Sequence, residues 1–227
     1  SARNTGIAAA RGRWVAFLDA DDVWEPEHLK SLLACASANG ADMAFSGHRF
    51  FQQKSRRVVN GDNPAAEHLR DLPNAVYGAL FVIRPSAVLI ERKALDRFGP
   101  VAVDFPHTND TEYWLRILRG GGRISYTGTA TCICRDHEAS MSKRLGEFFE
   151  DNARLCERYG DWPAVSSRVR RTRSAMFYRF ASRMLENEDR PKAYAFLVKA
   201  FRANPASLKT LLSFPRFFFK SRFRRIR

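Results

Sequence analysis

Short apolar runs alternate with helix-like patterns over the first 140 residues. The runs at 13–18, 42–52, 86–91, 124–126 and 129–134 are rich in strand-forming residues. Segments 2–11, 26–38, 92–98 and 110–119 carry apolar residues at helical spacing, and glycines follow them. Alternation of this kind predicts an α/β layered sheet with flanking helices, in which 13–18 is a buried parallel strand.

The pattern changes after Leu145, where only helical periodicity remains. We expect helices at 146–159, 163–186 and 191–203, followed by a basic, Phe-rich end. Residues 53–85 show a turn signal at Asn60-Gly61 and otherwise no readable pattern. The sequence thus predicts an α/β domain over 1–144 and a basic helical region over 145–227. One helix pair in that region could form a tetratricopeptide-type unit, which is too little for a repeat array.

The charge of the chain is divided between these two parts. Residues 1–165 hold 21 Lys and Arg against 21 Asp and Glu, whereas residues 166–227 hold 17 against 3. The second part therefore carries the whole net charge of +14. This asymmetry indicates an anionic partner, and the aromatics interleaved with cations near the C-terminus suit an anionic membrane surface. A solvated basic end is the equally weighted alternative, and no nucleic acid is expected because no nucleic-acid-binding motif is present.

The cysteines and the apolar runs indicate the cellular compartment in which the protein is expected. The four cysteines show no paired CxxC spacing, so a structural zinc site is not predicted, and Cys132 and Cys134 are interpreted as buried thiols on one face of a strand. No apolar run approaches the roughly 20 residues that cross a bilayer. We expect a reduced, cytoplasmic protein, peripheral at most on the cytoplasmic face of the membrane.

Three carboxylates follow the first apolar run, at Asp19, Asp21 and Asp22. Ligands of open α/β sheets bind at the carboxyl ends of strands, and clustered carboxylates are tolerated where a divalent cation neutralises them. Mg²⁺ and Mn²⁺ prefer such oxygen ligands together with phosphate oxygens. The alternative is a helix cap by Asp22 with Asp21 solvated.

The run ARNTGIAAARGRWVAFLDADDVWEPEHL resembles the central motif of the inverting family 2 glycosyltransferases, which have the GT-A fold. The resemblance implies that Asp21 ligates the Mg²⁺ or Mn²⁺ that bridges the donor diphosphate. It implies that Asp19 contacts the ribose or the metal shell and that Asp22 supports that shell. Arg3 and Asn4 would lie near the donor pocket.

A second acidic segment, Asn109 to Arg116, resembles the family's Glu-Asp-x-x-x-Trp-x-Arg helix start. The resemblance makes Asp110 the catalytic base, although Asn109 replaces the usual Glu. The alternative is that Asp110 and Glu112 are first-turn acids favoured by the helix dipole. Trp114 is interpreted as a core residue, and Arg116 pairs with an acid or reaches a phosphate.

The segment 135–142 resembles the family's Arg-x-His-x-x-Ser-x-Ser stretch. Arg135 would then neutralise the leaving diphosphate and His137 would complete the metal shell. A plain surface role for His137 is the alternative.

The resemblance covers residues 2 to about 142 and implies a metal-dependent transferase. It would move a sugar from a UDP-, GDP- or dTDP-sugar to a saccharide or lipid-linked acceptor with inversion, in cell-surface polysaccharide or glycolipid synthesis. A non-catalytic scaffold and a basic membrane-associated adaptor are the rival functions. Family members begin with nucleotide-binding strands that do not precede Ser1, so we expect an N-terminally truncated fragment with an exposed sheet edge that is itself inactive.

Overall fold

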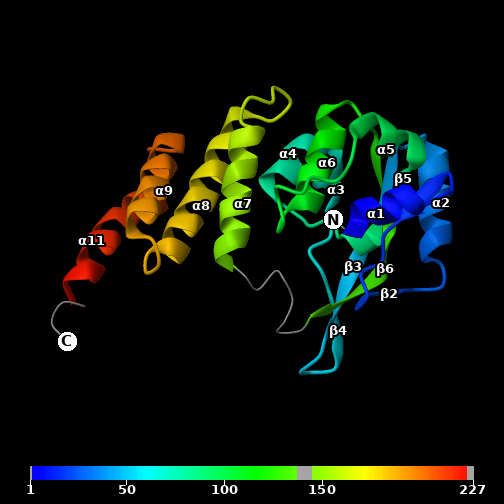
Figure 1. The fold of residues 1–227 in the computed structure, drawn as a ribbon, viewed down its shortest axis with the longest axis horizontal. Helices are drawn as coiled ribbons and strands as arrows, with labels where there is room; N and C mark the ends of the chain where they lie inside the picture. Colours follow the sequence, from blue (N-terminus) through cyan, green and yellow to red (C-terminus); the bar gives the residue numbers. More distant parts are fainter. Residues whose placement is uncertain (1, 137–144, 224–227) are drawn as a thin grey trace. The chain divides into compact units, whose positions relative to one another are not determined.

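The computed structural model describes residues 2–136 and 145–223. The chain divides into two compact units, residues 1–140 and 141–227. The first unit contains the sheet and its helices, and the second contains helices among the described residues (Figure 1).

Six strands form one sheet within the described part of the first unit. Their order is β1-β5-β3-β6-β2, with β4 paired to β3. The β3–β6 pair is parallel, and the other pairs are antiparallel. The strands are β1 (Trp14–Ala16), β2 (Val23–Trp24), β3 (Met43–Gln52), β4 (Arg57–Asn60), β5 (Val88–Glu91) and β6 (Ile124–Asp136).

The helices of this unit connect and cover the strands (Figure 1). They are α1 (Ala2–Ala9), α2 (His28–Asn39), α3 (Ala66–Arg70), α4 (Leu72–Gly78), the 3₁₀ turn η1 (Pro85–Ala87), α5 (Arg92–Phe98) and α6 (Asn109–Arg119). Helix α2 ends where Gly40 adopts a left-handed backbone with φ of 52°, which is the helix stop that the Asn39-Gly40 pair predicts.

Both faces of the central strand β3 are covered. Ala44 packs in a cluster with Leu32 and Ala36 of α2. Phe45, the next residue along the strand, points to the opposite face and stacks on Phe81, with ring centroids 5.9 Å apart. Continuous burial from residue 43 to residue 48 follows from this two-sided packing, as expected of a strand inside an α/β layer.

The prediction of a buried parallel strand at 13–18 is wrong in two respects. The strand spans only Trp14–Ala16, and it runs antiparallel to β5 with Val15 opposite Ile90. Val15 is buried, while its two neighbours are half-buried because β1 lies at the end of the described sheet. Apolarity alone does not distinguish a strand at this position from a central strand.

Four further differences from the sequence predictions concern β6, β4, η1 and the stretch without a readable pattern. The segments 124–126 and 129–134 are one strand, β6, whose irregularity falls at Gly128 with φ of 80°. The polar stretch after β3 contains β4, which makes a hairpin with β3. The start of the strand predicted at 86–91 is instead the turn η1. The helices α3 and α4 lie in the stretch without a readable pattern.

The second unit contains α7 (Leu145–Arg158), α8 (Ser167–Leu185), α9 (Arg190–Ala203), α10 (Leu208–Leu211) and α11 (Ser213–Phe223). Helices α7, α8 and α9 pack in consecutive order (Figure 1). Their boundaries agree with the helices that the periodicity predicts, within a few residues at each end. Phe217 of α11 is buried in a cluster with Leu185 and Leu197. In the described ranges, no helix combines the length and apolarity that a membrane span requires.

Candidate active site

The acidic loop after β1 is anchored to the 3₁₀ turn η1. The backbone N–H of Asp19 donates to the hydroxyl of Ser86 over 3.0 Å, and the N–H of Asp22 donates to the carbonyl of Asp19 over 3.0 Å. Asp19, Asp21 and Asp22 are half-buried. The loop is therefore a closed turn that holds three carboxylates at the end of the strand.

Asp22 does not cap the following helix. Helix α2 begins at His28, and its N-cap position is Glu27, whose side chain makes no capping hydrogen bond. Asp22 instead accepts a hydrogen bond from the backbone N–H of Arg135 over 3.1 Å. The carboxylate thus ties the acidic loop to the end of β6, and the cap alternative is wrong.

Arg3 connects the two acidic segments. Its Nη1 donates to Oδ1 of Asn109 over 2.7 Å, and its Nη2 lies 3.3 Å from Oδ1 of Asp19. Asn109 directly precedes Asp110, so the loop after β1 and the first turn of α6 meet at one guanidinium. Asn4 fixes α1 in this position through hydrogen bonds of 2.9 Å in both directions with the backbone of Val101.

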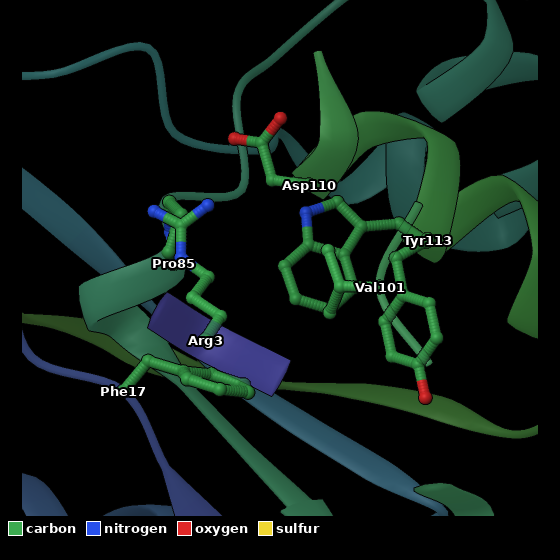
Figure 2. A pocket seen from close by; sticks show the side chains of 7 residues that line it. Arg3, Phe17, Pro85, Val101, Asp110 and Tyr113 are labelled. Atoms are coloured by element: carbon green, nitrogen blue, oxygen red, sulfur yellow. The ribbon is translucent and has the colours of Figure 1, made fainter. Parts of the chain in front are cut away.

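Asp110 borders a hollow of about 210 Å³, part of it open solvent. The lining residues are Arg3, Phe17, Pro85, Val101, Asp110, Tyr113 and Trp114. Figure 2 shows the charged ends of Arg3 and Asp110 on the same side of this hollow. The arrangement places a carboxylate and a guanidinium at one hollow that is partly open to solvent.

The surroundings of Asp110 make its carboxyl more basic. Burial raises its pKa, against the opposing effects of a 2.6 Å hydrogen bond from the N–H of Thr111 and of the cations Arg3 and Arg84. A raised pKa suits a general base, because the carboxylate then takes up a proton more readily.

Arg84 belongs to the site and has no signal in the sequence analysis. It is half-buried, it acts electrostatically on Asp110, and its guanidinium lies 5.0 Å from the ring centroid of Phe50. Its Nε is buried and has no hydrogen-bond partner in the described part of the chain. Arg84 lies in a stretch without a readable pattern, and a single Arg that belongs to no motif gives no sequence signal of a site.

Arg116 is engaged inside the fold. Its Nη2 lies 2.8 Å from Oε2 of Glu112, which is buried, and its Nη1 donates to the carbonyl of Phe98 over 2.9 Å. The ion pair is one of the two options that the sequence left open. Trp114 is 3% exposed and donates to the carbonyl of Ile83 over 3.2 Å, so its interpretation as a core residue is confirmed.

The third predicted element is partly described. Arg135 is exposed at the end of β6, next to Asp22. His137, predicted as a metal ligand, lies outside the described residues.

The donor set suits a hard cation. Asp19 and Asp21 offer carboxylate oxygens that are accessible to solvent, and Arg3 already neutralises part of the charge of Asp19. Oxygen-only ligands with room for phosphate oxygens fit Mg²⁺ or Mn²⁺.

Comparisons with known proteins find similarity to glycosyltransferases. Residues 1–99 match the model of the family described as Glycosyl transferase family 2. The UDP-Glc:alpha-D-GlcNAc-diphosphoundecaprenol beta-1,3-glucosyltransferase WfgD of Escherichia coli is 26% identical over 164 residues, which are 71% of this chain and 59% of that protein. The succinoglycan biosynthesis protein ExoO of Rhizobium meliloti is 54% identical over 43 residues, 19% of this chain and 12% of the relative.

Solved structures agree on the fold. TarS 1-349 of S. aureus in complex with UDP-GlcNAc superimposes with a TM-score of 0.58 at 15% identity, covering 88% of this chain and 60% of that one. The GT-A prediction for the fold is confirmed by this match. The chain spans a little over half the length of the curated Escherichia coli relatives it matches.

Proposed function

We propose that this chain is a glycosyltransferase of family 2, whose model residues 1–99 match, and that it transfers a sugar from a nucleotide-diphosphate donor to an acceptor hydroxyl with inversion. The observation that carries the proposal is the convergence at Arg3, which contacts Asp19 on one side and Asn109, next to Asp110, on the other. The diphosphate loop and the base thereby share one site.

Asp110 acts as the general base. As the acceptor oxygen attacks the anomeric carbon, its proton passes to the Asp110 carboxylate, and the bond from that carbon to the diphosphate breaks. One displacement inverts the anomeric configuration. Burial of Asp110 supports this role, because it raises the pKa of the carboxyl.

Asp21, with Asp19 beside it, would hold Mg²⁺ or Mn²⁺, which supplies charge neutralisation for the leaving diphosphate. Arg3 and the exposed Arg135 add positive charge near the same loop. Arginine forks suit phosphate oxygens because they donate two parallel hydrogen bonds. His137 remains a proposed addition to the cation shell.

The acceptor is proposed to be a lipid-linked saccharide. Support comes from the Escherichia coli relatives, whose names give a UDP-Glc donor and a diphosphoundecaprenol-linked acceptor. Arg84, which acts electrostatically on Asp110, offers a second cation for an acceptor phosphate. Cell-surface polysaccharide or glycolipid synthesis is the corresponding process.

The second unit is proposed to bind the cytoplasmic face of an anionic membrane. Its described residues expose Leu208, Leu211, Leu212 and Phe218 among basic side chains. Apolar side chains at the headgroup boundary and cations facing anionic lipids are the usual basis of such binding. This location would bring the site to a lipid-linked acceptor.

Conservative changes of the two acids test the proposal in the native protein. Asp110→Asn is expected to lower transfer by about 10²–10⁴-fold with donor binding retained, since only the proton acceptor is lost. Asp21→Asn is expected to weaken donor binding as well. Glu67→Gln, at an exposed acid in the first turn of α3, is the matched control. Transfer by Asp110→Asn at the control rate would favour the scaffold alternative.

A further inference from the structure

Two thiols and a carboxylate converge behind the acidic loop. Cys132 and Cys134 occupy alternate positions of β6, and their Sγ atoms lie 3.9 Å apart. One carboxylate oxygen of Asp22 joins them, and the three ligand atoms lie within 4.8 Å of one another. In the described ranges this is the group of His, Cys, Asp and Glu side chains that meets that spacing.

The thiol separation suits a tetrahedral cation. With Zn–S bonds of about 2.3 Å and a tetrahedral angle, two sulfur ligands lie roughly 3.8 Å apart. The observed 3.9 Å therefore needs almost no movement of the strand. The backbone holds this geometry, because β2 pairs with β6 at Trp24 opposite Cys132 and Asp22 accepts from the N–H of Arg135.

The two sides of the group differ in polarity. Cys132 and Cys134 are 0% and 5% exposed and pack with Ala87, Trp24 and Phe50. Asp22 is half-buried and forms the open side. An ion would thus meet sulfur ligands from the core and a carboxylate plus water from the solvent side, the mixed arrangement of an open tetrahedral site.

We propose that Cys132, Cys134 and Asp22 form a binding site for a thiophilic divalent cation such as Zn²⁺ or Cd²⁺. Each thiol gives up its proton to solvent as its sulfur binds, and a water molecule completes the four ligands. In the empty state the hydrogen bond between the two sulfur atoms, burial and the charge of Asp22 raise the pKa of Cys134, which favours the neutral thiol at that position. A coordinated cation reverses that preference.

This site is chemically separate from the oxygen site proposed at Asp21. Sulfur ligands select soft cations, whereas Mg²⁺ and Mn²⁺ prefer oxygen. Asp22 is shared by the acidic loop, so occupancy would restrain that loop and lower transfer. That consequence rests on the proposed function, whereas cation binding does not.

Cadmium titration of the 227-residue chain tests the site directly. Cd²⁺ is expected to produce a thiolate-to-metal absorption band that saturates at one ion per chain, with release of two protons per ion in weakly buffered solution. Cys134→Ser and Cys132→Ser should each reduce affinity at least tenfold and weaken the band. Asp22→Asn should reduce affinity with the band retained, because both sulfurs remain.

Cys35→Ser is the matched control, since Cys35 is a free, half-buried cysteine on α2. It should leave the band unchanged. Absence of a band in the unaltered chain overturns the proposal, and so does a band of full strength in Cys134→Ser. Neither reading requires an active transferase, so failure of the site and failure of the proposed function remain distinguishable.

Discussion

At the scale of single residues, the site depends on a carboxylate whose charged form is destabilised by burial. The cations Arg3 and Arg84 lower the pKa of Asp110, while burial raises it by more. The balance keeps the carboxyl ionisable yet basic. Both its chemistry and its cost to folding follow from this balance.

Asp110→Asn should raise the melting temperature at neutral pH while strongly lowering transfer. The folded state holds the proton of Asp110 more tightly than the unfolded state, so ionisation costs stability as pH rises through the raised pKa. The stability gain of the variant should therefore be largest above that pKa and shrink toward acid pH. Thermal unfolding of both proteins from pH 4 to pH 8 measures it, and a gain independent of pH would contradict the argument.

Arg84 should tune the base. Arg84→Met removes a cation that lowers the pKa of Asp110, so the acidic limb of the pH–rate profile should move to higher pH and kcat/KM should fall roughly tenfold or more. Arg84→Lys keeps the charge and should leave the limb close to its original position.

Arg70→Met, at the exposed end of α3, controls for loss of surface charge. An unshifted limb in Arg84→Met would show that Arg84 does not act on the base.

At the scale of elements, the parallel β3–β6 pair places the site. The pair carries Phe50 opposite Cys134, and its register shifts at Gly47. The hairpin from β3 to β4 closes against His48, whose carbonyl accepts from the N–H of Gly61 over 3.1 Å. Burial lowers the pKa of His48 to about 4, so this imidazole is neutral in the folded state near pH 7.

Gly61→Ala should destabilise this hairpin. A Cβ at Gly61 would lie 2.2 Å from Nε2 of His48, which is 1% exposed and has little room to move. We expect a loss of about 1–3 kcal/mol in the free energy of unfolding. Chemical denaturation measures it.

Gly6→Ala is the matched control, because a Cβ there has nothing within 4 Å. In the helix α1 it should be neutral or stabilising by up to about 1 kcal/mol. Equal effects of the two substitutions would refute the steric explanation.

At the scale of the whole molecule, the chain separates a neutral unit that holds the site from a basic unit that holds none of the predicted site residues. All the excess positive charge falls after residue 165. The described helices of the second unit pack through small and aromatic residues such as Ala153, Tyr178 and Ala200. Some of its cations pair inside the unit, as Lys192 does with Glu150 and Lys199 with Glu157, and the excess of cations over acids suits an anionic partner.

The chain should bind anionic vesicles more strongly than zwitterionic ones, and high salt should weaken the binding. Each basic residue near an anionic surface contributes about 1 kcal/mol, a term that salt screens. Leu208→Ser with Leu212→Ser should reduce flotation, because these side chains are 67% and 62% exposed.

Leu29→Ser, at an exposed leucine of α2 in the first unit, serves as the control. Equal flotation with neutral and anionic vesicles would remove the membrane proposal and leave the solvated alternative.

The sequence by itself determined the α/β class and most helices, because glycine stops and hydrophobic periodicity are local properties of the chain. Helices α5 and α6 fall within a residue of their predicted positions for that reason. The sequence also proposed the acidic loop and Asp110 as site residues, through resemblance to two motifs of one family. Residues 1–99, which hold the first of these motifs, match the model of that family.

Only the tertiary structure decided how these pieces meet. The direction of β1, the joining of two segments into β6 and the placement of Arg84 beside Asp110 depend on contacts between distant residues. The meeting of Asp22 with Cys132 and Cys134 likewise links positions about 110 residues apart. Contacts of this kind join residues that are far apart in the sequence, so no local pattern encodes them.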